Sequence, residues 1–481
     1  MLKTLVFMPV LGALLVAVLP VRRALPLWQV AMCFALAALG YAGWLAFQFD
    51  PAGAAIQMHE SKAWNVRLGS YFALGVDGIS LAMVLLTALL TLIAVLVSRR
   101  MDLGARLYFM LVLLLESAMF GVFMARDWSL FYVFWEATLI PLFFLIDRLG
   151  GQNRQRAALN FFLYTLGGSV LMLVSLLFLY DAAPGHSFAM GDMAAGGRDL
   201  PLSTQLLIFA GLFLGFGVKM PVFPLHGWLP LAHVEAPSPV SILLSGVLLK
   251  MGAYGLIRAA ETLPAALLAT QDGLMVLAVI SLIYGAVLAW RQQDLKAMVA
   301  YSSISHMGVV LLGIATLNVT GLTGAVMQMV AHGLTAALLF MLVGLLYQRT
   351  HSRNLADYAS LQTSAPRFAF FLAFALLAAL GLPGSAGFVA ELHVLLGGWL
   401  HWKFWMALLC LAMLVGAAYS LRVMGRVGLK GPVMVIDDMT RTELTAAGVL
   451  VVCIVWLGLW PAPLLDLVAG SVGQIARLFG G

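Results

Sequence analysis

Runs of apolar residues, separated by short polar breaks, follow one another along almost the whole chain. A transmembrane helix needs about 20 predominantly apolar residues, and most of these runs reach that length. The pattern predicts fourteen transmembrane helices, with longer polar connections at 49–71 and 181–202. The expected helices span 4–20, 26–48, 72–98, 106–125, 128–147, 157–180, 203–224, 238–259, 273–290, 298–317, 320–347, 367–398, 401–425 and 442–467. We therefore expect an all-α polytopic membrane protein.

The composition indicates that lipid, and not water, surrounds the chain. Of the 481 residues, 63% are hydrophobic and 10% are charged, whereas an ordinary soluble domain has about 25% charged residues. The net charge of +6 does not indicate nucleic acid as a partner, because the basic residues occur without any basic run or stripe. Cys33, Cys410 and Cys453 each stand alone in an apolar stretch. We therefore expect no iron–sulfur cluster, zinc site, disulfide or other cofactor in this chain.

The basic residues predict the orientation in the membrane. Of the 27 lysines and arginines, 17 fall in the loops that follow odd-numbered helices. They are Arg22, Arg23, Arg99, Arg100, Arg106, Arg148, Arg154, Arg156, Arg291, Lys296, Arg349, Arg353, Arg367, Arg422, Arg426, Lys430 and Arg441. Loops rich in lysine and arginine face the cytoplasm. Both termini should therefore lie on the non-cytoplasmic side of a bacterial inner membrane or an equivalent energy-coupling membrane.

Two of the expected helices contain breaks in the middle of the membrane. The seventh runs into a proline-rich segment at 218–224, and the twelfth contains a glycine-rich segment at 381–387. Proline removes a backbone donor, and exposed backbone is tolerated at this depth only inside protein or beside a wet cavity. Breaks five helices apart predict two inverted five-helix repeats, although simple proline kinks are the alternative. The expected divisions are 1–104 (helices 1–3), 105–260 (first repeat), 261–430 (second repeat) and 431–481 (helix 14).

Several charged residues lie within the expected membrane helices. They are Glu116, Glu136, Lys219, Lys250 and Glu391. Lys219 lies beside the first break and Glu391 beside the second. Each would cost about 2.5–3.5 kcal/mol at the centre of a membrane helix on insertion scales. Static ion pairs would explain any one of them. A set spread over both repeats indicates a proton path, because burial and nearby charge adjust how tightly Lys and Glu hold a proton.

Two histidines extend this set. His306 and His332 lie in the tenth and eleventh helices. A single histidine on an apolar face is usually structural, but these two stand between Lys250 and Glu391 in chain order and suit a proton relay. His226 and His233 could suggest a metal site, but their separation and proline-rich surroundings do not favour one. We expect no metal site.

Longer motifs resemble a known family. Residues 218–237, 248–255, 300–308 and 131–136 resemble the antiporter-like subunits of proton-pumping NADH:quinone oxidoreductase, respiratory complex I. The likeness extends over roughly 70–430. A glutamate at Glu391, where other branches of the family typically have lysine, is similar to the M-type subunits. Leu231 departs from the aspartate usual at its position, which puts the local loop contacts in doubt.

The resemblance implies fourteen helices in two inverted repeats and a relay with assigned roles. Glu136 modulates Lys219, Lys250 and the histidines pass protons on, and Glu391 serves the exit side. The chain would be a proton-translocating subunit without its own redox centre, driven by quinone reduction in other subunits. Its partners would be other membrane-arm subunits and the lipid bilayer.

Other functions stay open from the sequence. The chain could belong to a related assembly, such as an Mrp-type cation/proton antiporter or a membrane-bound hydrogenase. A self-sufficient transporter for a small solute would gather its charges around one pocket instead of along a line. A structural scaffold would not place several charges in the membrane.

Overall fold

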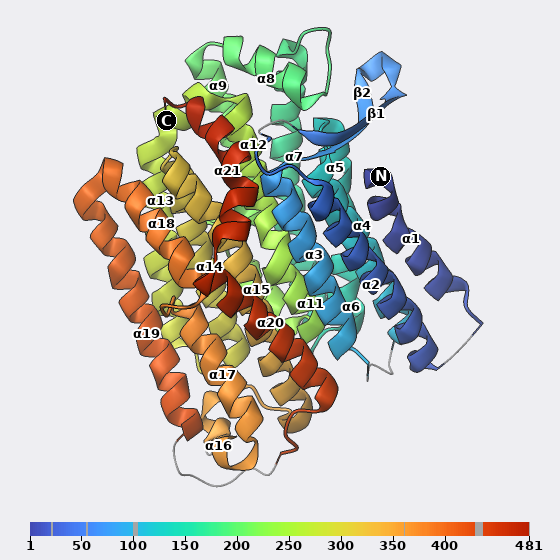
Figure 1. Cartoon of the computed structure of the whole chain (residues 1–481), viewed down its shortest axis with the longest axis vertical. Helices are drawn as coiled ribbons and strands as arrows, with labels where there is room; N and C mark the ends of the chain where they lie inside the picture. Colours follow the sequence, from blue (N-terminus) through green and yellow to red (C-terminus); the bar gives the residue numbers. More distant parts are fainter. Residues whose placement is uncertain (21–22, 54–55, 100–103, 360, 429–435, 481) are drawn as a thin grey trace.

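The computed structural model describes residues 1–20, 23–53, 56–99, 104–359, 361–428 and 436–480. Arg22, Arg100 and Lys430 of the basic residues counted above lie outside the described residues, and so does the expected division between 430 and 431. In the described part, long helices run side by side along the long axis of the molecule (Figure 1).

The first half of the chain contains a hairpin and the first broken helix. The strands β1 (Gln57–Asn65) and β2 (Ser70–Val76) pair antiparallel around the 3₁₀ turn η1 (Val66–Leu68). The helices are α1 (Leu2–Val18), α2 (Ala24–Gln48), α3 (Gly78–Val97), α4 (Ala105–Met124), α5 (Trp128–Ala137), α6 (Leu139–Leu149), α7 (Arg154–Ala182), α8 (Met190–Asp199), α9 (Leu202–Lys219), α10 (Leu229–Glu235), α11 (Ser238–Leu243), the π-helical η2 (Leu244–Leu248) and α12 (Leu249–Thr262).

The second half is helical throughout its described residues. Its elements are α13 (Pro264–Arg291), α14 (Leu295–Ala315), α15 (Val319–Thr350), η3 (Leu355–Tyr358), α16 (Leu361–Ser364), α17 (Pro366–Ala379), α18 (Ala386–Trp402), η4 (Lys403–Met406), α19 (Ala407–Gly428), α20 (Arg441–Leu459) and α21 (Ala462–Arg477). Helix α15 packs against α14 and α18 and is buried over most of its length.

The expected helices are present. Among the described residues, twelve helical segments are long and apolar enough to cross a membrane, and the shorter apolar helices α1 and α17 accompany them. Each of the fourteen expected ranges overlaps a helix. The breaks at 218–224 and 381–387 are confirmed, because α9 ends at Lys219 and the chain is not helical between α17 and α18. The division of the chain into two repeats at residue 260 stays a prediction.

Two expected helix ranges are wrong in detail. The third span begins at Gly78 and not at 72, because 70–76 form strand β2 and Asp77 caps α3. The expected helix 442–467 is two helices, since α20 ends at Leu459 and Pro461 precedes α21. The expected polar connections are not structureless, because they contain the hairpin and α8.

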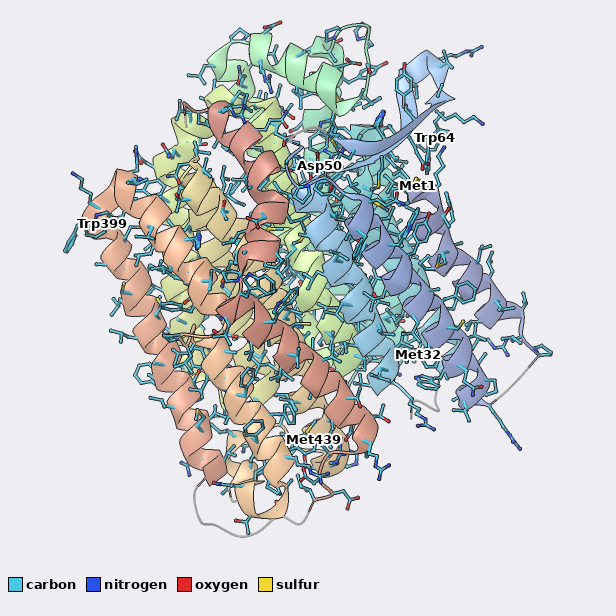
Figure 2. All side chains as sticks on the ribbon, in the orientation of Figure 1. Met1, Met32, Asp50, Trp64, Trp399 and Met439 are labelled. Atoms are coloured by element: carbon cyan, nitrogen blue, oxygen red, sulfur yellow. The ribbon has the colours of Figure 1, made fainter. Side chains whose placement is uncertain are left out.

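The outward faces of the bundle are apolar, as a lipid solvent requires. Helices α7 and α19 expose large apolar side chains, among them Leu163, Leu177, Phe178, Leu414 and Leu421. Figure 2 shows side chains extending from all sides of the bundle, with Trp399 at its outer edge. The charged groups of interest therefore lie inside a bundle whose surface suits lipid.

Candidate functional site

Lys219 is the last residue of α9, at the first break. Its side chain is almost fully buried, and its Nζ donates a hydrogen bond of 3.1 Å to Thr138 Oγ1. The same Nζ lies 5.2 Å from the centre of the Trp135 ring and 5.9 Å from that of Phe161. A hydroxyl and two aromatic faces thus hold a cation that has no carboxylate in contact.

Glu136 lies on α5 between Trp135 and Thr138, both of which contact Lys219. It is close enough to interact electrostatically with Lys219, yet no ion pair within 4.0 Å joins the two among the described residues. Glu136 Oε1 is buried and has no hydrogen-bond partner there. Glu136 and Lys219 are therefore neighbours without an ion pair, and Thr138, which the sequence did not single out, accepts the hydrogen bond from Lys219.

A glycine brings the helix of the second lysine against the first break. A Cβ at Gly252 in α12 would lie 2.5 Å from Phe216 O and 2.7 Å from Met220 N, the backbone around the end of α9. Because hydrogen is the only side chain that fits, α12 approaches the end of α9 closely. Lys250 lies two residues before this glycine.

Lys250 is fully buried and contacts a histidine. Its Nζ lies 2.6 Å from His332 Nδ1, and it donates a 2.5 Å hydrogen bond to Ser245 O in the π-helical turn η2. Ser245 Oγ lies 3.0 Å from Ser303 Oγ on α14. Lys250 and His332 are far apart in the sequence, and the packing of α11 and η2 against α15 brings them together.

The line continues from His332 to Glu391. The ring centres of His332 and His306 are 5.2 Å apart, and His306 Nδ1 lies 4.0 Å from Glu391 Oε1. Gln328 Nε2 lies 3.3 Å from His306 Nδ1. A small cavity touches all four of these side chains, and its free space suits about one water molecule.

The second break makes room for the glutamate. Gly381 has a φ of 74°, and a Cβ there would lie 2.2 Å from Glu391 Oε2. Only glycine combines this conformation with this clearance. Glu391 Oε2 has no hydrogen-bond partner among the described residues, so the carboxylate has a free acceptor at the end of the line.

The structure thus places the six predicted residues in two groups. Glu136 lies near Lys219, and Lys250 is followed by His332, His306 and Glu391. The order of the histidines in space is the reverse of their order in the chain. Sequence reasoning missed Thr138 and Gln328. It weighed His233 only as a metal ligand. His233 is fully buried and stacks on Phe340 at 4.4 Å, and neither of its ring nitrogens has a hydrogen-bond partner among the described residues.

Glu116 stays outside both groups. It is fully buried in α4, and neither of its carboxylate oxygens has a hydrogen-bond partner among the described residues. Its depth in the membrane was evident from the sequence, but its surroundings give it no contact with the line of groups described above.

The fold and the line of buried ionisable groups define a polytopic membrane protein of the ion-translocating class. Residues 125–416 match the family model of the transmembrane domain of NADH:quinone oxidoreductases and Mrp antiporters. The chain belongs to this family. It is 43% identical over 399 residues to NAD(P)H-quinone oxidoreductase chain 4 2 of Thermosynechococcus vestitus, covering 82% of this chain and 74% of that protein. It is 37% identical over 444 residues to NADH-quinone oxidoreductase subunit M of Rickettsia conorii, covering 91% and 89%.

Solved structures agree with this family. A chain of respiratory complex I from Thermus thermophilus with bound NADH superposes with a TM-score of 0.91 at 32% identity, over 100% of both chains. A chain of the membrane-bound sulfane sulfur reductase, an archaeal respiratory complex, gives 0.86 at 23% identity over 97% of this chain and 77% of that one. A chain of the Mrp complex from Dietzia gives 0.84 at 23% identity over 100% and 55%. The last two likenesses show the fold alone.

Proposed function

We propose that this chain is the M-type, or chain 4, membrane-arm subunit of a proton-translocating quinone oxidoreductase of the complex I type. Protons move along its buried line of ionisable groups from Glu136 to Glu391, and redox chemistry in other subunits drives them. The observation that carries the proposal is the continuous contact from Lys250 through His332 and His306 towards Glu391. Each member of that line can hold or release a proton.

Proton movement follows from the alternation of occupied and empty sites. A proton on Lys250 can pass directly to His332 Nδ1, because the two nitrogens are 2.6 Å apart. The step from His332 to His306 crosses a wider gap beside the small cavity, where one water can bridge the rings. Glu391 then accepts the proton and delivers it to the exit side.

The electrostatic interaction between Glu136 and Lys219 controls when a proton moves along the line. Two unit charges about 4 Å apart interact by about 4 kcal/mol at an effective dielectric of 20. This energy changes proton occupancy about a thousandfold. Movement of Glu136 towards Lys219 would hold a proton on the lysine. Movement away would release the proton towards Lys250 on the closely packed α12.

The proposal includes the surroundings of the chain. Other membrane-arm subunits are its partners, the redox centres lie in those or in peripheral subunits, and both termini face the non-cytoplasmic side. Identities of 32–43% with quinone oxidoreductase chains favour this assembly over a cation/proton antiporter, for which the likeness is 23%.

The test is Lys219→Arg in the assembled complex. Arginine keeps the positive charge but does not release its proton at any relevant pH. We expect NADH-driven proton uptake by inverted membrane vesicles to fall at least tenfold, which corresponds to about 1.4 kcal/mol of lost coupling. Lys62→Arg, on the exposed hairpin, serves as the matched control and should pump at the wild-type rate. Pumping by Lys219→Arg at the wild-type rate would show that Lys219 is a static cation.

A further inference from the structure

A second polar region lies at the end of the bundle that carries the hairpin and α8. A cavity of about 390 Å³ opens there between α8, the end of α12 and α21. Arg126, Arg198 and Arg258 line it. None of them belongs to the proton line, and the cavity is far larger than the one beside His306.

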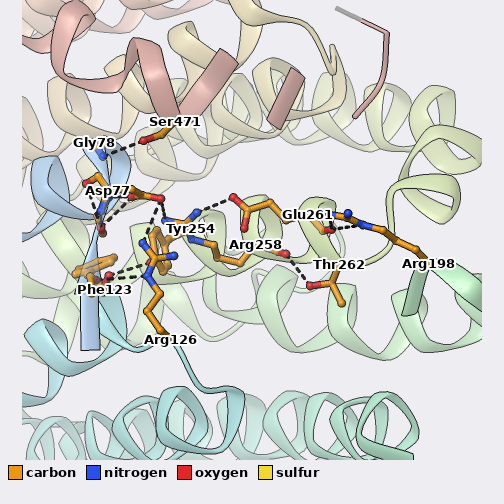
Figure 3. A network of polar contacts seen from close by, with 12 residues as sticks. Asp77, Gly78, Phe123, Arg126, Arg198, Tyr254, Arg258, Glu261, Thr262 and Ser471 are labelled. Carbon is orange, nitrogen blue, oxygen red and sulfur yellow. Dashed lines mark hydrogen bonds and ion pairs between the residues drawn. The ribbon is translucent and has the colours of Figure 1, made fainter. Parts of the chain in front are cut away.

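The arginines and two carboxylates form one network (Figure 3). Arg258 Nη2 donates a 2.5 Å hydrogen bond to Asp77 Oδ2, and Arg126 Nη2 lies 3.2 Å from the same oxygen. Arg258 Nη1 lies 2.7 Å from Glu261 Oε1, and Arg198 Nη2 donates a 2.8 Å hydrogen bond to Glu261 O. Arg126, Arg258 and Asp77 are all buried. Three guanidinium groups therefore face two carboxylates, which leaves one positive charge in surplus on the wall.

Several donors on this wall have no protein acceptor. Arg126 Nη2 is buried and, apart from its ion pair with Asp77, has no hydrogen-bond partner among the described residues. Trp128 Nε1 and Arg258 Nε are buried without a partner as well. The N-terminus of α8 also lines the cavity, and Ala189 provides no side-chain cap for its first-turn amides. Buried donors are normally satisfied, and arginines beside an uncapped helix N-terminus are suited to a phosphate.

Part of the remaining lining is apolar, although His59, Thr262 and Gln474 also line the cavity. Ile56, Met190, Ile475 and Leu478 lie around the same cavity. A site with one cationic wall and one apolar wall suits an amphipathic anion better than a small free ion.

The depth of the cavity supports the same chemistry. The membrane-spanning segments that surround it end or begin there, since α3 begins at Gly78, α4 ends at Met124 and α12 ends at Thr262. This is the level at which lipid headgroups lie. We propose that the cavity binds the phosphate group of an anionic phospholipid, with the headgroup on Arg126 and Arg198 and the glycerol end against the apolar wall.

The test compares lipid retention by variants of the whole complex. Ala194→Trp fills the cavity from the side of α8 without changing any ion pair, and Arg126→Gln removes one guanidinium group from the cationic wall. The matched control is Ala195→Trp, one residue further on α8 and on its exposed side. Each complex is delipidated and then titrated with phosphatidylglycerol, phosphatidylcholine or inorganic phosphate. Bound lipid is counted by native mass spectrometry, and the thermal unfolding midpoint is followed.

We expect wild type and Ala195→Trp to retain one more tightly bound phosphatidylglycerol per complex than Ala194→Trp. Arg126→Gln should need about tenfold more phosphatidylglycerol for the same retention, the effect of losing one charge-assisted hydrogen bond. Phosphatidylcholine should not replace it. Inorganic phosphate could instead raise the unfolding midpoint of wild type but not of Ala194→Trp. That result would identify free phosphate, and not a lipid headgroup, as the ligand of the cavity. Equal phosphatidylglycerol retention by all four proteins, with no variant-dependent phosphate shift, would overturn the proposal. If Arg126→Gln fails to assemble, Ala194→Trp decides alone.

Discussion

Lys219 illustrates how single residues determine the chemistry of the line. A buried lysine with a carboxylate in contact would hold its proton permanently, whereas Lys219 has a neutral hydroxyl and two aromatic faces around it. Thr138 Oγ1 donates its own hydrogen to Trp135 O and so offers its lone pairs to the lysine. On the proposed function, these neutral neighbours would stabilise the ammonium in the membrane while still allowing it to release a proton.

We therefore expect Thr138→Val to lower proton pumping severalfold while the complex still assembles. Valine keeps the shape but removes the one hydrogen-bond acceptor of Lys219, at a cost of about 1.5–3 kcal/mol for a bond to a charged group. Proton uptake and NADH oxidation are measured together in inverted vesicles. Thr138→Ser keeps the hydroxyl and should restore most of the pumping. Equal pumping by the valine and serine variants would show that the hydroxyl is dispensable.

The sequence shows which charged residues lie in membrane helices, where a charge has a high free-energy cost, but it does not show which of them contact one another. Lys219, Lys250 and Glu391 stand out because each charge lies within an apolar run. Thr138 and Gln328 do not stand out, since neutral polar residues are common in membrane helices. The contact of Lys250 with His332 depends on how α11 and η2 pack against α15. No local pattern encodes that packing, so the sequence does not show which of the two histidines contacts Lys250.

At the scale of elements, the two broken helices place the ends of the line. Lys219 ends α9, and Glu391 faces the glycine turn between α17 and α18. Proline and glycine made both breaks predictable. Pro461 carried the same signal for the break between α20 and α21, which the long apolar run concealed. The hairpin was not predictable in this way, because β1 is largely exposed and does not show a regular alternation of apolar and polar residues.

The close approach of α12 to α9 can be tested at Gly252. We expect Gly252→Ala to lower both the pumping rate and the thermal unfolding midpoint of the complex, because the added methyl group would meet backbone atoms at 2.5 and 2.7 Å and push the helices apart. Gly273→Ala in α13 is the control, since a Cβ there meets nothing within 4 Å. That change should be neutral or stabilise by about 1 kcal/mol. Equal behaviour of the two variants would show that the spacing of α9 and α12 is not critical.

Asp77, at the start of α3, connects this helix to α12 through its ion pair with Arg258 and to the segment before α5 through its ion pair with Arg126. It caps α3 and accepts hydrogen bonds from Ser80 and Arg258. Burial alone would raise the pKa of Asp77, but Arg258 and Arg126 outweigh burial and hold that pKa well below its usual range. A carboxylate of this kind contributes stability that is present above its unfolded pKa, about 3.9, and is lost as the pH falls through its folded pKa.

Asp77→Asn should therefore lower the unfolding midpoint by an amount that does not change between about pH 5 and pH 8. Loss of one member of a buried ion pair costs about 3–5 kcal/mol. Below about pH 4 the difference between wild type and variant should shrink, because wild type then loses the contribution of the pair. Thermal unfolding of the purified complex at a series of pH values measures this difference. A difference that grows towards acid pH would contradict the assignment.

At the scale of the whole molecule, the ends of the bundle differ in charge and structure. The N-terminus, the last turn of α21, the hairpin and α8 lie towards one end, while α1, α6 and α19 end at the other (Figure 1). Many of the basic residues counted from the sequence lie in or beside the helix ends at this second end, among them Arg148, Arg154, Arg156, Arg426 and Arg441. The even number of membrane crossings is what places the two termini together.

This asymmetry predicts the orientation of the chain, which single cysteines can report. Lys62→Cys places a thiol on the exposed hairpin, and Arg156→Cys places one at the start of α7, at the opposite end. Because basic loops stay in the cytoplasm, a membrane-impermeant maleimide should label Lys62→Cys in intact spheroplasts and Arg156→Cys only in inverted vesicles. The unsubstituted chain gives the background of the natural Cys33, Cys410 and Cys453. The reverse labelling pattern would place both termini in the cytoplasm and would invert the direction assigned to the proton line, with Glu391 then serving the entry side.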